Sequence, residues 1–342
     1  MFIHTDQIFS PCLKVQKRNS KMSENNRLLK IINGNNEFKI AHDEIELELG
    51  RVFTSDQAID LFASIGVSLI KSDESYVFRK IDFLDKESIR EKIDQIEGSS
   101  NILLAVEQII ETTSRFFSNK DIEKYEYSIC FAEFQTKGRG RGENMWLSPY
   151  GSGICFSIKG FLPCKFSPLG LSIYCGITIV DILRELGFKD VSLKWPNDLL
   201  HKGKKLGGIL TELTNQHAEN YVFNIGIGIN YDLGSELNSM EQNLFPPTDL
   251  MKIYDGTDIS RTEISGILAK TIIESLKNFD QKKMQESFKS WPKLDAFHQK
   301  EIKIIDDDRS LKGKNMGIDD TGALLLDEGG DIKKIYNGHL VI

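Results

Sequence analysis

A glycine- and arginine-rich run at residues 137–151 has residue types that suit the binding of an anion. It alternates the two types before a tryptophan: Gly138, Arg139, Gly140, Arg141, Gly142 and Trp146. Glycine lets a backbone approach a ligand closely, and arginine offers a planar fork of donors that matches phosphate or carboxylate. We therefore predict a mobile cationic loop that closes over an anion. The alternative is an RNA-binding Arg/Gly tract, but the run does not repeat and an apolar segment follows it at once.

Three further segments follow this run in order: Lys194–Asp198 (KWPND), Lys204–Glu212 (KKLGGILTE) and Gly226–Asn230 (GIGIN). With a fitting C-terminal tail, the ordered set resembles the biotin protein ligases. The resemblance extends from about Ser99 to Ile342 and more weakly into the N-terminal part. Any one of these motifs is a modest signal, whereas four in order are specific.

The cations in these motifs suit the activation of a carboxylic acid by ATP. A carboxylate must attack the α-phosphate, so the site needs positive charge to bring two anions together and to stabilise the transition state. The candidates are Arg139, Arg141, Lys194 and Lys205. The resemblance implies catalytic roles for Lys205, near the biotin carboxylate, and for Arg139 and Arg141. It places Gly138 and Gly140 in the same ligand-binding loop. Spacing alone leaves it equally open that Lys205 is a solvated lysine in a hairpin turn.

A biotin site must offer a few hydrogen bonds to the ureido ring inside an apolar pocket. By resemblance, Ser99, Ser100 and Asn101 occupy the Ser-Thr-Asn position of the family. Gln135 occupies the position of a glutamine that precedes the loop. The alternative is that Ser99 or Ser100 caps a helix predicted over residues 101–117, a role that is compatible with ligand binding.

Other motif residues are predicted to border the ligands. Gly226 and Gly228 are too short a signal for a dinucleotide fingerprint, which needs a following helix, but they let a strand approach a ligand. Asn230, at the end of that strand, is predicted to help place ATP or magnesium. Trp146 is predicted to pack on the purine or to close the loop, with a plain core role as the alternative.

Asp198 is the candidate ligand for Mg²⁺, and Asn197 is a polar partner beside it. The alternatives for Asp198 are that it orients Lys194 or caps a turn. The loop also departs from many family members, because Gly142-Glu143-Asn144 stands where they carry further basic residues. We expect activity to survive this change and retention of the adenylate to be weaker.

The elements that position these motifs predict an α+β catalytic domain. Strands are expected over residues 127–134, 154–158, 191–195, 206–213 and 221–230, and helices over 101–117, 169–186 and 262–279. The resemblance implies the class II synthetase-like fold. From Glu301 onward, short strands alternate with Gly/Asp turns, which predicts a C-terminal SH3-like β-barrel.

The N-terminal part predicts three helices, over residues 27–32, 43–50 and 54–66, and then two strands around a polar turn within 67–80. This order is typical of a winged helix-turn-helix domain. The predicted divisions are a disordered extension at 1–25, the winged-helix-like domain at 26–82, the catalytic domain at 83–295 and the SH3-like domain at 296–342. Met22 is an alternative start of the chain.

DNA affinity comes mainly from Lys and Arg against phosphates, and this N-terminal part is acidic. Residues 40–66 hold six acids and one arginine, a net charge of −5. The expected wing tip is Ser72-Asp73-Glu74-Ser75. We therefore predict that the domain binds DNA weakly, with repression of a biotin operon as the alternative.

Composition limits the remaining classes. The chain has 342 residues, a net charge of −7 and five cysteines without a CxxC pair, as expected for a multidomain cytoplasmic protein with reduced thiols. No signal peptide or membrane span is expected. The predicted function is an ATP-dependent biotin protein ligase. It would make biotinyl-5′-AMP and transfer biotin to a lysine of the biotin carboxyl carrier protein of acetyl-CoA carboxylase. A homodimer through strand edges is expected by resemblance, and a lipoate ligase is a further alternative.

Overall fold

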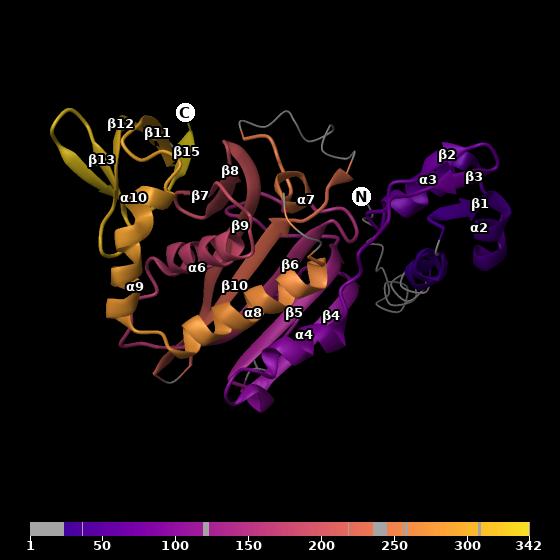
Figure 1. The fold of residues 1–342 in the computed structure, drawn as a ribbon, viewed down its shortest axis with the longest axis horizontal. Helices are drawn as coiled ribbons and strands as arrows, with labels where there is room; N and C mark the ends of the chain where they lie inside the picture. Colours follow the sequence, from indigo (N-terminus) through magenta and orange to yellow (C-terminus); the bar gives the residue numbers. More distant parts are fainter. Residues whose placement is uncertain are drawn as a thin grey trace, which may run out of the picture. The chain divides into compact units, whose positions relative to one another are not determined.

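The computed structural model describes residues 24–341, with gaps at 36, 119–122, 218, 235–244, 255, 257–258 and 307–308. The chain divides into two compact units, Met1–Lys80 and Ile81–Ile342 (Figure 1). Most of the extension predicted at residues 1–25, with Cys12, lies outside the described residues. No helix among the described residues combines the length and apolar character that crossing a membrane requires.

The first unit contains three helices and a small sheet. A helix over residues 24–34 is followed by β1 (Lys39–Ala41), α2 (His42–Leu49), α3 (Ser55–Ala63), β2 (Ile70–Ser72) and β3 (Ser75–Val77). The strands form an antiparallel sheet in the order β1-β3-β2. The predicted three helices and hairpin are confirmed. Gly50, with φ of 69°, ends α2, and Thr54 caps α3. Strand β1 was not predicted.

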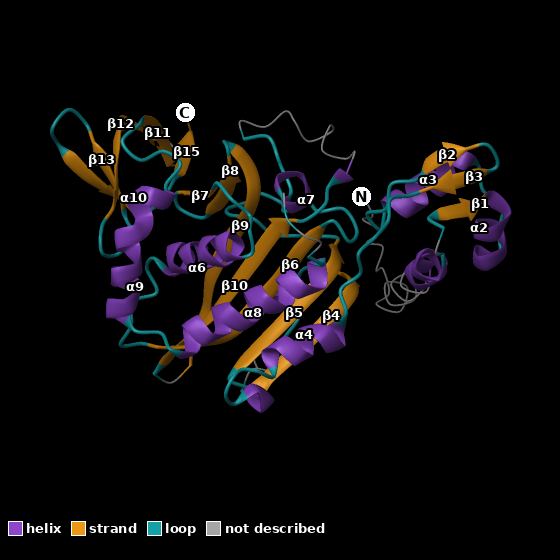
Figure 2. Ribbon diagram, viewed as in Figure 1, coloured by secondary structure: helices purple, strands orange, loops and turns teal. Residues whose placement is uncertain are grey.

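A seven-stranded mixed sheet forms the centre of the second unit (Figure 2). Its order is β4-β5-β6-β10-β9-β8-β7, and only the β4–β5 pair is parallel. The strands are β4 (Ile102–Ile110), β5 (Tyr127–Gln135), β6 (Gly153–Pro163), β7 (Val191–Lys194), β8 (Asp198–His201), β9 (Lys204–His217) and β10 (Asn220–Asn230). The predicted strands are confirmed, and the mixture of α and β structure agrees with the predicted class.

Helices pack against one face of this sheet and bury their apolar sides there (Figure 2). They are α4 (Lys86–Ile93), α6 (Leu171–Glu185) and α8 (Arg261–Lys277), with α7 (Leu250–Ile253), α9 (Gln281–Ser287) and α10 (Trp291–Leu294) nearby in sequence. Helices α6 and α8 confirm the predicted pair. Helix α4 was not predicted, although Asp85 caps it by accepting a hydrogen bond of 2.8 Å from Ser88 N and Ile89 and Ile93 form its buried stripe.

The helix predicted over residues 101–117 is wrong. Ser99–Asn101 form one 3₁₀ turn, and residues 102–110 form the edge strand β4 in parallel register with β5. A short apolar run fits both periods, and β-branched residues such as Ile102, Val106 and Ile109 pack well on a pleated surface. Because a strand follows, neither Ser99 nor Ser100 caps a helix of the predicted kind.

The C-terminal residues form a five-stranded antiparallel sheet in the order β14-β13-β12-β11-β15. Its strands are β11 (Glu301–Asp306), β12 (Arg309–Ile318), β13 (Leu324–Asp327), β14 (Ile332–Ile335) and β15 (His339–Val341). The predicted alternation of short strands and turns is confirmed. Asp295 joins this sheet to the helices, because it accepts hydrogen bonds from Trp291 Nε1 at 3.1 Å and Asn315 Nδ2 at 2.8 Å.

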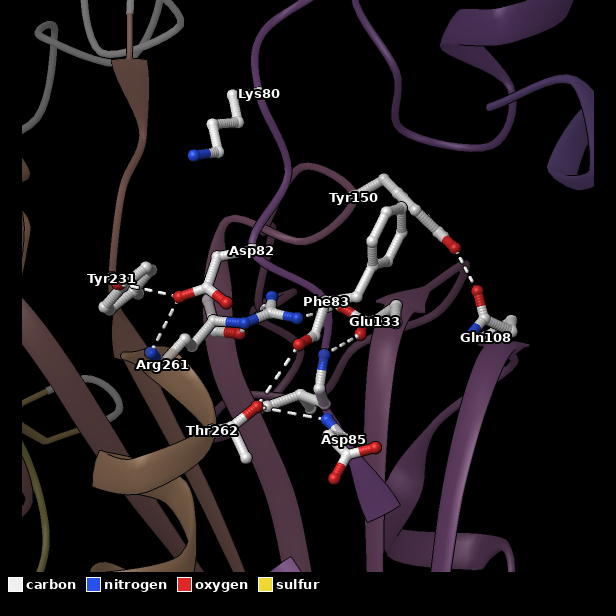
Figure 3. A network of polar contacts seen from close by, with 12 residues as sticks. Lys80, Asp82, Phe83, Asp85, Gln108, Glu133, Tyr150, Tyr231, Arg261 and Thr262 are labelled. Atoms are coloured by element: carbon white, nitrogen blue, oxygen red, sulfur yellow. Dashed lines mark hydrogen bonds and ion pairs between the residues drawn. The ribbon is translucent and has the colours of Figure 1, made fainter. Parts of the chain in front are cut away.

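A buried polar network fixes the start of the second unit against the sheet (Figure 3). At its centre, Arg261 of α8 pairs with Glu133 of β5, and both side chains are fully buried. Glu133 also accepts a hydrogen bond of 2.7 Å from Leu84 N, and Asp82 accepts one of 2.8 Å from Arg261 N. The segment that enters the second unit is thereby attached to a helix and a central strand.

Candidate active site

The predicted motifs converge on one pocket at the end of β5 and over the middle of β9 and β10. The glycine- and arginine-rich loop and the end of β15 complete its wall. Sequence-predicted residues that line it are Gln135, Arg139, Gly140, Arg141, Trp146, Lys194, Asn197, Asp198, Lys205, Gly226 and Gly228. Segments far apart in sequence therefore meet at one site.

Asp198 lies between two lysines at the base of the pocket. One carboxylate oxygen is 2.6 Å from Lys194 Nζ, and the other is 2.8 Å from Lys205 Nζ. Burial acts to raise the pKa of Asp198, but the two ammonium groups outweigh it and hold that pKa below its ordinary value. The cluster carries a net charge of +1, so it attracts an anion.

The two lysines differ in access to the pocket. The side chain of Lys194 is 11% exposed, and its ammonium lies 4.6 Å from the centre of the Phe245 ring. The side chain of Lys205 is 36% exposed. Asn230, which does not line the pocket, donates hydrogen bonds from Nδ2 to the carbonyls of Thr248 at 2.9 Å and Lys205 at 3.3 Å. Asn230 therefore holds the backbone that presents Lys205.

The arginine loop is a small hairpin in this structure. Gly140 N donates to Asn144 O at 2.8 Å, and Trp146 N donates to Gly138 O at 3.0 Å. A Cβ added to Gly138 would lie 2.2 Å from the Trp146 carbonyl oxygen, and one added to Gly140 would lie 3.1 Å from that of Asn144. These glycines allow the two arms of the hairpin to approach each other closely. The sequence had predicted that they let a ligand approach instead.

Both predicted loop arginines are engaged with other parts of the chain. Arg139 forms a two-pronged ion pair with Glu212 of β9, with both N–O distances at 2.7 Å. Arg141 donates from Nη1 to the carbonyl of Gly338 at 3.1 Å, which joins the loop to the C-terminal sheet. Burial lowers the pKa of Arg141 against the opposing effect of the Asp198 and Asp306 carboxylates.

Trp146 packs its indole ring over Gly228. A Cβ added to Gly228 would lie 2.5 Å from this ring, whereas one added to Gly226 would be 3.6 Å from its nearest neighbour, Ser157 Oγ. The Lys205 ammonium is 5.9 Å from the centre of the Trp146 ring. Gly228 is therefore required by the tryptophan, and Gly226 leaves its strand open to the pocket.

A group of hydroxyls and one amide lines another part of the pocket. Thr113 N donates to Gln135 Oε1 at 2.8 Å, and the Thr113 and Ser157 hydroxyls are 2.7 Å apart. Thr112 and Ser114 complete this group. The sequence signal was the hydroxyl run Thr112-Thr113-Ser114 after an apolar segment, which the predicted helix concealed.

Ser99, Ser100 and Asn101 do not line the pocket. They precede β4, whereas Thr112–Ser114 follow it. Nine strand residues at about 3.3 Å each separate the two ends by roughly 30 Å. Residues 99–101 therefore do not border this pocket as predicted, and the hydroxyl run after β4 lines it instead.

Comparisons with known proteins identify the family of this chain. Residues 106–232 match the Biotin/lipoate A/B protein ligase family, and residues 297–339 match the Biotin protein ligase C terminal domain. The Bifunctional ligase/repressor BirA of Escherichia coli (strain K12) is 32% identical, over 72% of this chain and 75% of the relative. The chain belongs to the biotin protein ligase family.

Other members of the biotin protein ligase family extend the comparison. Biotin--protein ligase 2 of Arabidopsis thaliana is 28% identical, over 63% of this chain and 68% of that protein. The solved biotin protein ligase from Aquifex aeolicus in complex with biotin and ATP is 28% identical, with a TM-score of 0.56. It matches 70% of this chain and 97% of that structure.

For a biotin protein ligase, Asp198 does not fit the predicted role of Mg²⁺ ligand. Both of its oxygens are taken by ammonium groups, and two adjacent cations repel a dication. Among the described residues, no group of three or more His, Cys, Asp and Glu side chains could hold a metal ion. Mg²⁺ commonly binds through substrate phosphates and one or two carboxylates.

Proposed function

We propose that the chain is an ATP-dependent biotin protein ligase. Membership of the family supports this proposal, and so does the Lys194–Asp198–Lys205 cluster beside the two loop arginines. This cluster supplies the positive charge that a carboxylate and a triphosphate need in order to meet. In the first reaction, an oxygen of the biotin carboxylate attacks the α-phosphate of ATP. Pyrophosphate leaves, and biotinyl-5′-AMP forms.

Within this function, we propose separate roles for the parts of the pocket. The ureido ring is proposed to meet the hydroxyl and amide group around Thr113, Gln135 and Ser157, because these side chains offer both donors and acceptors. The tail then extends toward Lys205, the proposed catalytic cation. Arg139 and Arg141 are proposed to hold the phosphates of ATP, which would replace Glu212 and the Gly338 carbonyl as their partners.

The remaining pocket residues are proposed to shape the adenylate site. Gly226 leaves room for the ligand on β10, and Trp146 borders it. Gly138, Gly140 and Gly228 act indirectly, by allowing the hairpin and the tryptophan to pack. Asn230 acts through the backbone of Lys205.

In the second reaction, a lysine of a carrier protein attacks the adenylate. We propose the biotin carboxyl carrier protein of acetyl-CoA carboxylase as the acceptor and a homodimer formed through strand edges of the main sheet. The edge strand β4 pairs on one side only among the described residues, which supports such an interface.

We propose four divisions: an extension at 1–25, a winged-helix-like domain at 26–82, a class II synthetase-like catalytic domain at 83–295 and an SH3-like barrel at 296–342. The first compact unit ends at Lys80, two residues before the proposed end of the winged-helix-like domain. The order of helices and hairpin in the first unit supports the second of these. The antiparallel five-stranded sheet supports the last. Buried free cysteines support the predicted cytoplasmic location.

A second function, repression of a biotin operon, is favoured by the similarity to the Escherichia coli relative, a bifunctional ligase/repressor. The acidic surface of the first unit argues against it. A lipoate ligase is the third alternative, since the matched family includes lipoate enzymes.

One experiment separates biotin from lipoate as the substrate. The full chain is incubated with ATP, Mg²⁺ and either acid, and the acyl-adenylate is measured by mass spectrometry. We expect biotinyl-5′-AMP and no lipoyl-AMP. Formation of lipoyl-AMP alone would identify a lipoate ligase, and formation of neither would contradict both assignments.

A further inference from the structure

His339 of the C-terminal sheet lines the pocket, although no motif pointed to it. It begins β15, pairs with Ile305 of β11 and is exposed to solvent. The adjacent residue, Gly338, accepts the hydrogen bond of 3.1 Å from Arg141. An imidazole is thus held next to the arginine loop, in the lining of the same pocket.

The second reaction needs a group that accepts a proton. An acceptor lysine is an ammonium ion at neutral pH and must lose a proton before its nitrogen can attack. Among the residues that the structure describes, six titratable side chains line the pocket: Arg139, Arg141, Lys194, Asp198, Lys205 and His339. The arginines and lysines are already protonated, and Asp198 is a weak base between two ammonium groups. Histidine is the remaining lining residue type that exchanges a proton near pH 7.

We propose that His339 is the general base of biotin transfer. This inference rests on the ligase function. The imidazole takes one proton from the acceptor ammonium, and the freed amine attacks the acyl carbon of biotinyl-5′-AMP. A C–N bond forms, and the bond between the acyl carbon and the phosphate oxygen breaks. AMP leaves with that electron pair, and the second proton of the nitrogen passes to its phosphate.

Charges around His339 fit this role. The strand paired with β15 carries Glu301, Lys303 and Asp306, and the loop contributes Arg141. Arg141 and the lysine cluster attract the anionic adenylate into the pocket that His339 lines.

Single-turnover transfer tests the proposal. Adenylate is first formed on the full chain from biotin, ATP and Mg²⁺, and then a carrier domain or hydroxylamine is added at pH 7. Hydroxylamine is already neutral at this pH and needs no base. We expect His339→Gln to slow transfer to the carrier by about 10²-fold or more and to leave transfer to hydroxylamine unchanged. His201→Gln, on β8 away from the pocket, is the matched control and should slow neither.

Three outcomes would overturn the assignment. The first is equal slowing with both nucleophiles, which would make His339 an adenylate-binding residue, and the second is no slowing with either. The third comes from the unmodified protein, whose rate of transfer to the carrier should rise with pH and then level off, as expected for a single general base. A rise that continues without levelling to pH 9 would exclude a histidine base even if the variant did not fold. Absence of any adenylate in the first stage would instead contradict the ligase function.

Discussion

At the scale of residues, the site depends on how each charge is paired. Lys194 and Lys205 contact the same carboxylate, but Lys194 is 11% exposed and Lys205 is 36% exposed. The buried ion pair of Lys194, packed near a ring, stabilises the fold, whereas the partly exposed ammonium of Lys205 can reach a ligand. The sequence alone left Lys205 undecided between a turn lysine and a catalytic one, and its contact with Asp198 favours the second.

Lys205→Ala should reduce the rate of adenylate formation by about 10²–10³-fold, because a cation that faces the reacting anions is lost. The fold should survive, since Lys194 still pairs with Asp198 at 2.6 Å. The rate is measured as pyrophosphate release with biotin and ATP. Lys204→Ala changes an exposed neighbour that does not line the pocket, and its rate of adenylate formation should be near that of the unmodified protein. Near-normal adenylation by Lys205→Ala would remove it from the catalytic set.

Arg141→Gly should weaken retention of the adenylate more than its synthesis. The substitution removes the hydrogen bond that joins the loop to Gly338, so the loop covers the ligand less firmly. Released adenylate would then label lysines of an unrelated bystander protein such as albumin, which a biotin blot detects. Lys137→Ala, a loop cation paired with Glu111 at 3.0 Å outside the pocket, is the control. Labelling that stays confined to the carrier would show that Arg141 does not retain the adenylate.

At the scale of elements, the arginine loop packs on strand β10 only because Gly228 leaves space for the Trp146 ring. Gly228→Ala should destabilise the ligand-free protein by about 1–3 kcal/mol, because the new methyl group would overlap the Trp146 ring. Tryptophan fluorescence should shift to longer wavelength as Trp146 meets water. Gly208→Ala is the control, since its Cβ would meet its nearest atoms at 3.6 and 3.7 Å. If both variants unfold at the same denaturant concentration, the tryptophan does not depend on Gly228.

Arg261→Met should lower the stability of the second unit by about 3–5 kcal/mol, because Glu133 would remain buried without its partner charge. Urea unfolding followed by circular dichroism measures this loss. Adding Glu133→Leu should restore part of the stability, since the unpaired charge is then removed as well. Lys289→Met, whose pair with Glu286 is more than two-thirds exposed on both sides, should change stability little. A similarly small effect of Arg261→Met would contradict a supporting role for the network.

Strands and helices with a single clear period could be predicted from the sequence, as β5, β10, α6 and α8 show. The segment at 101–117 could not, because its continuous apolar residues suit a helix and an edge strand equally. Only pairing with β5 decides between them, and that partner lies about 25 residues further along the chain.

The site was predictable where residue types carry rare chemistry, as in the arginine loop and the Lys205 segment. It was not predictable for Thr112–Ser114, whose position depends on β4 being a strand, nor for His339. Nothing in a sequence shows that the end of a C-terminal sheet closes a pocket more than a hundred residues away. Likewise, Asp198 was placed at the site correctly, but its two lysine partners became visible only in three dimensions.

At the scale of the whole molecule, the two units carry different surfaces. The second unit gathers cations around its pocket, whereas the described first unit has ten acids and seven basic residues between positions 24 and 80. On α3, Asp56 and Asp60 are both exposed, four residues apart on one face of the helix. The hairpin turn between β2 and β3 exposes Asp73 and Glu74.

These acids predict that the first unit binds DNA weakly. A helix and a hairpin that approached DNA with these side chains would meet phosphates of like sign. Two of the nearby cations are also already engaged. Arg51 pairs with Glu24, and Lys71 donates to Ser55 Oγ at 2.8 Å. We expect weak binding without sequence preference, even when biotin and ATP have formed the adenylate.

A DNA-binding titration at several salt concentrations tests this prediction. The full chain, with biotin and ATP, is titrated into the promoter of the organism's own biotin genes and, as a control, into a scrambled duplex. Each phosphate contact adds about 0.9 to the slope of log affinity against log salt, so few contacts predict a shallow slope. Residues 1–21 hold Lys14, Lys17, Arg18 and Lys21, and a variant that starts at Met22 removes this charge. Binding lost in that variant would come from the extension. Saturable binding to the promoter alone, at nanomolar protein and physiological salt and retained without the extension, would instead establish a bifunctional repressor.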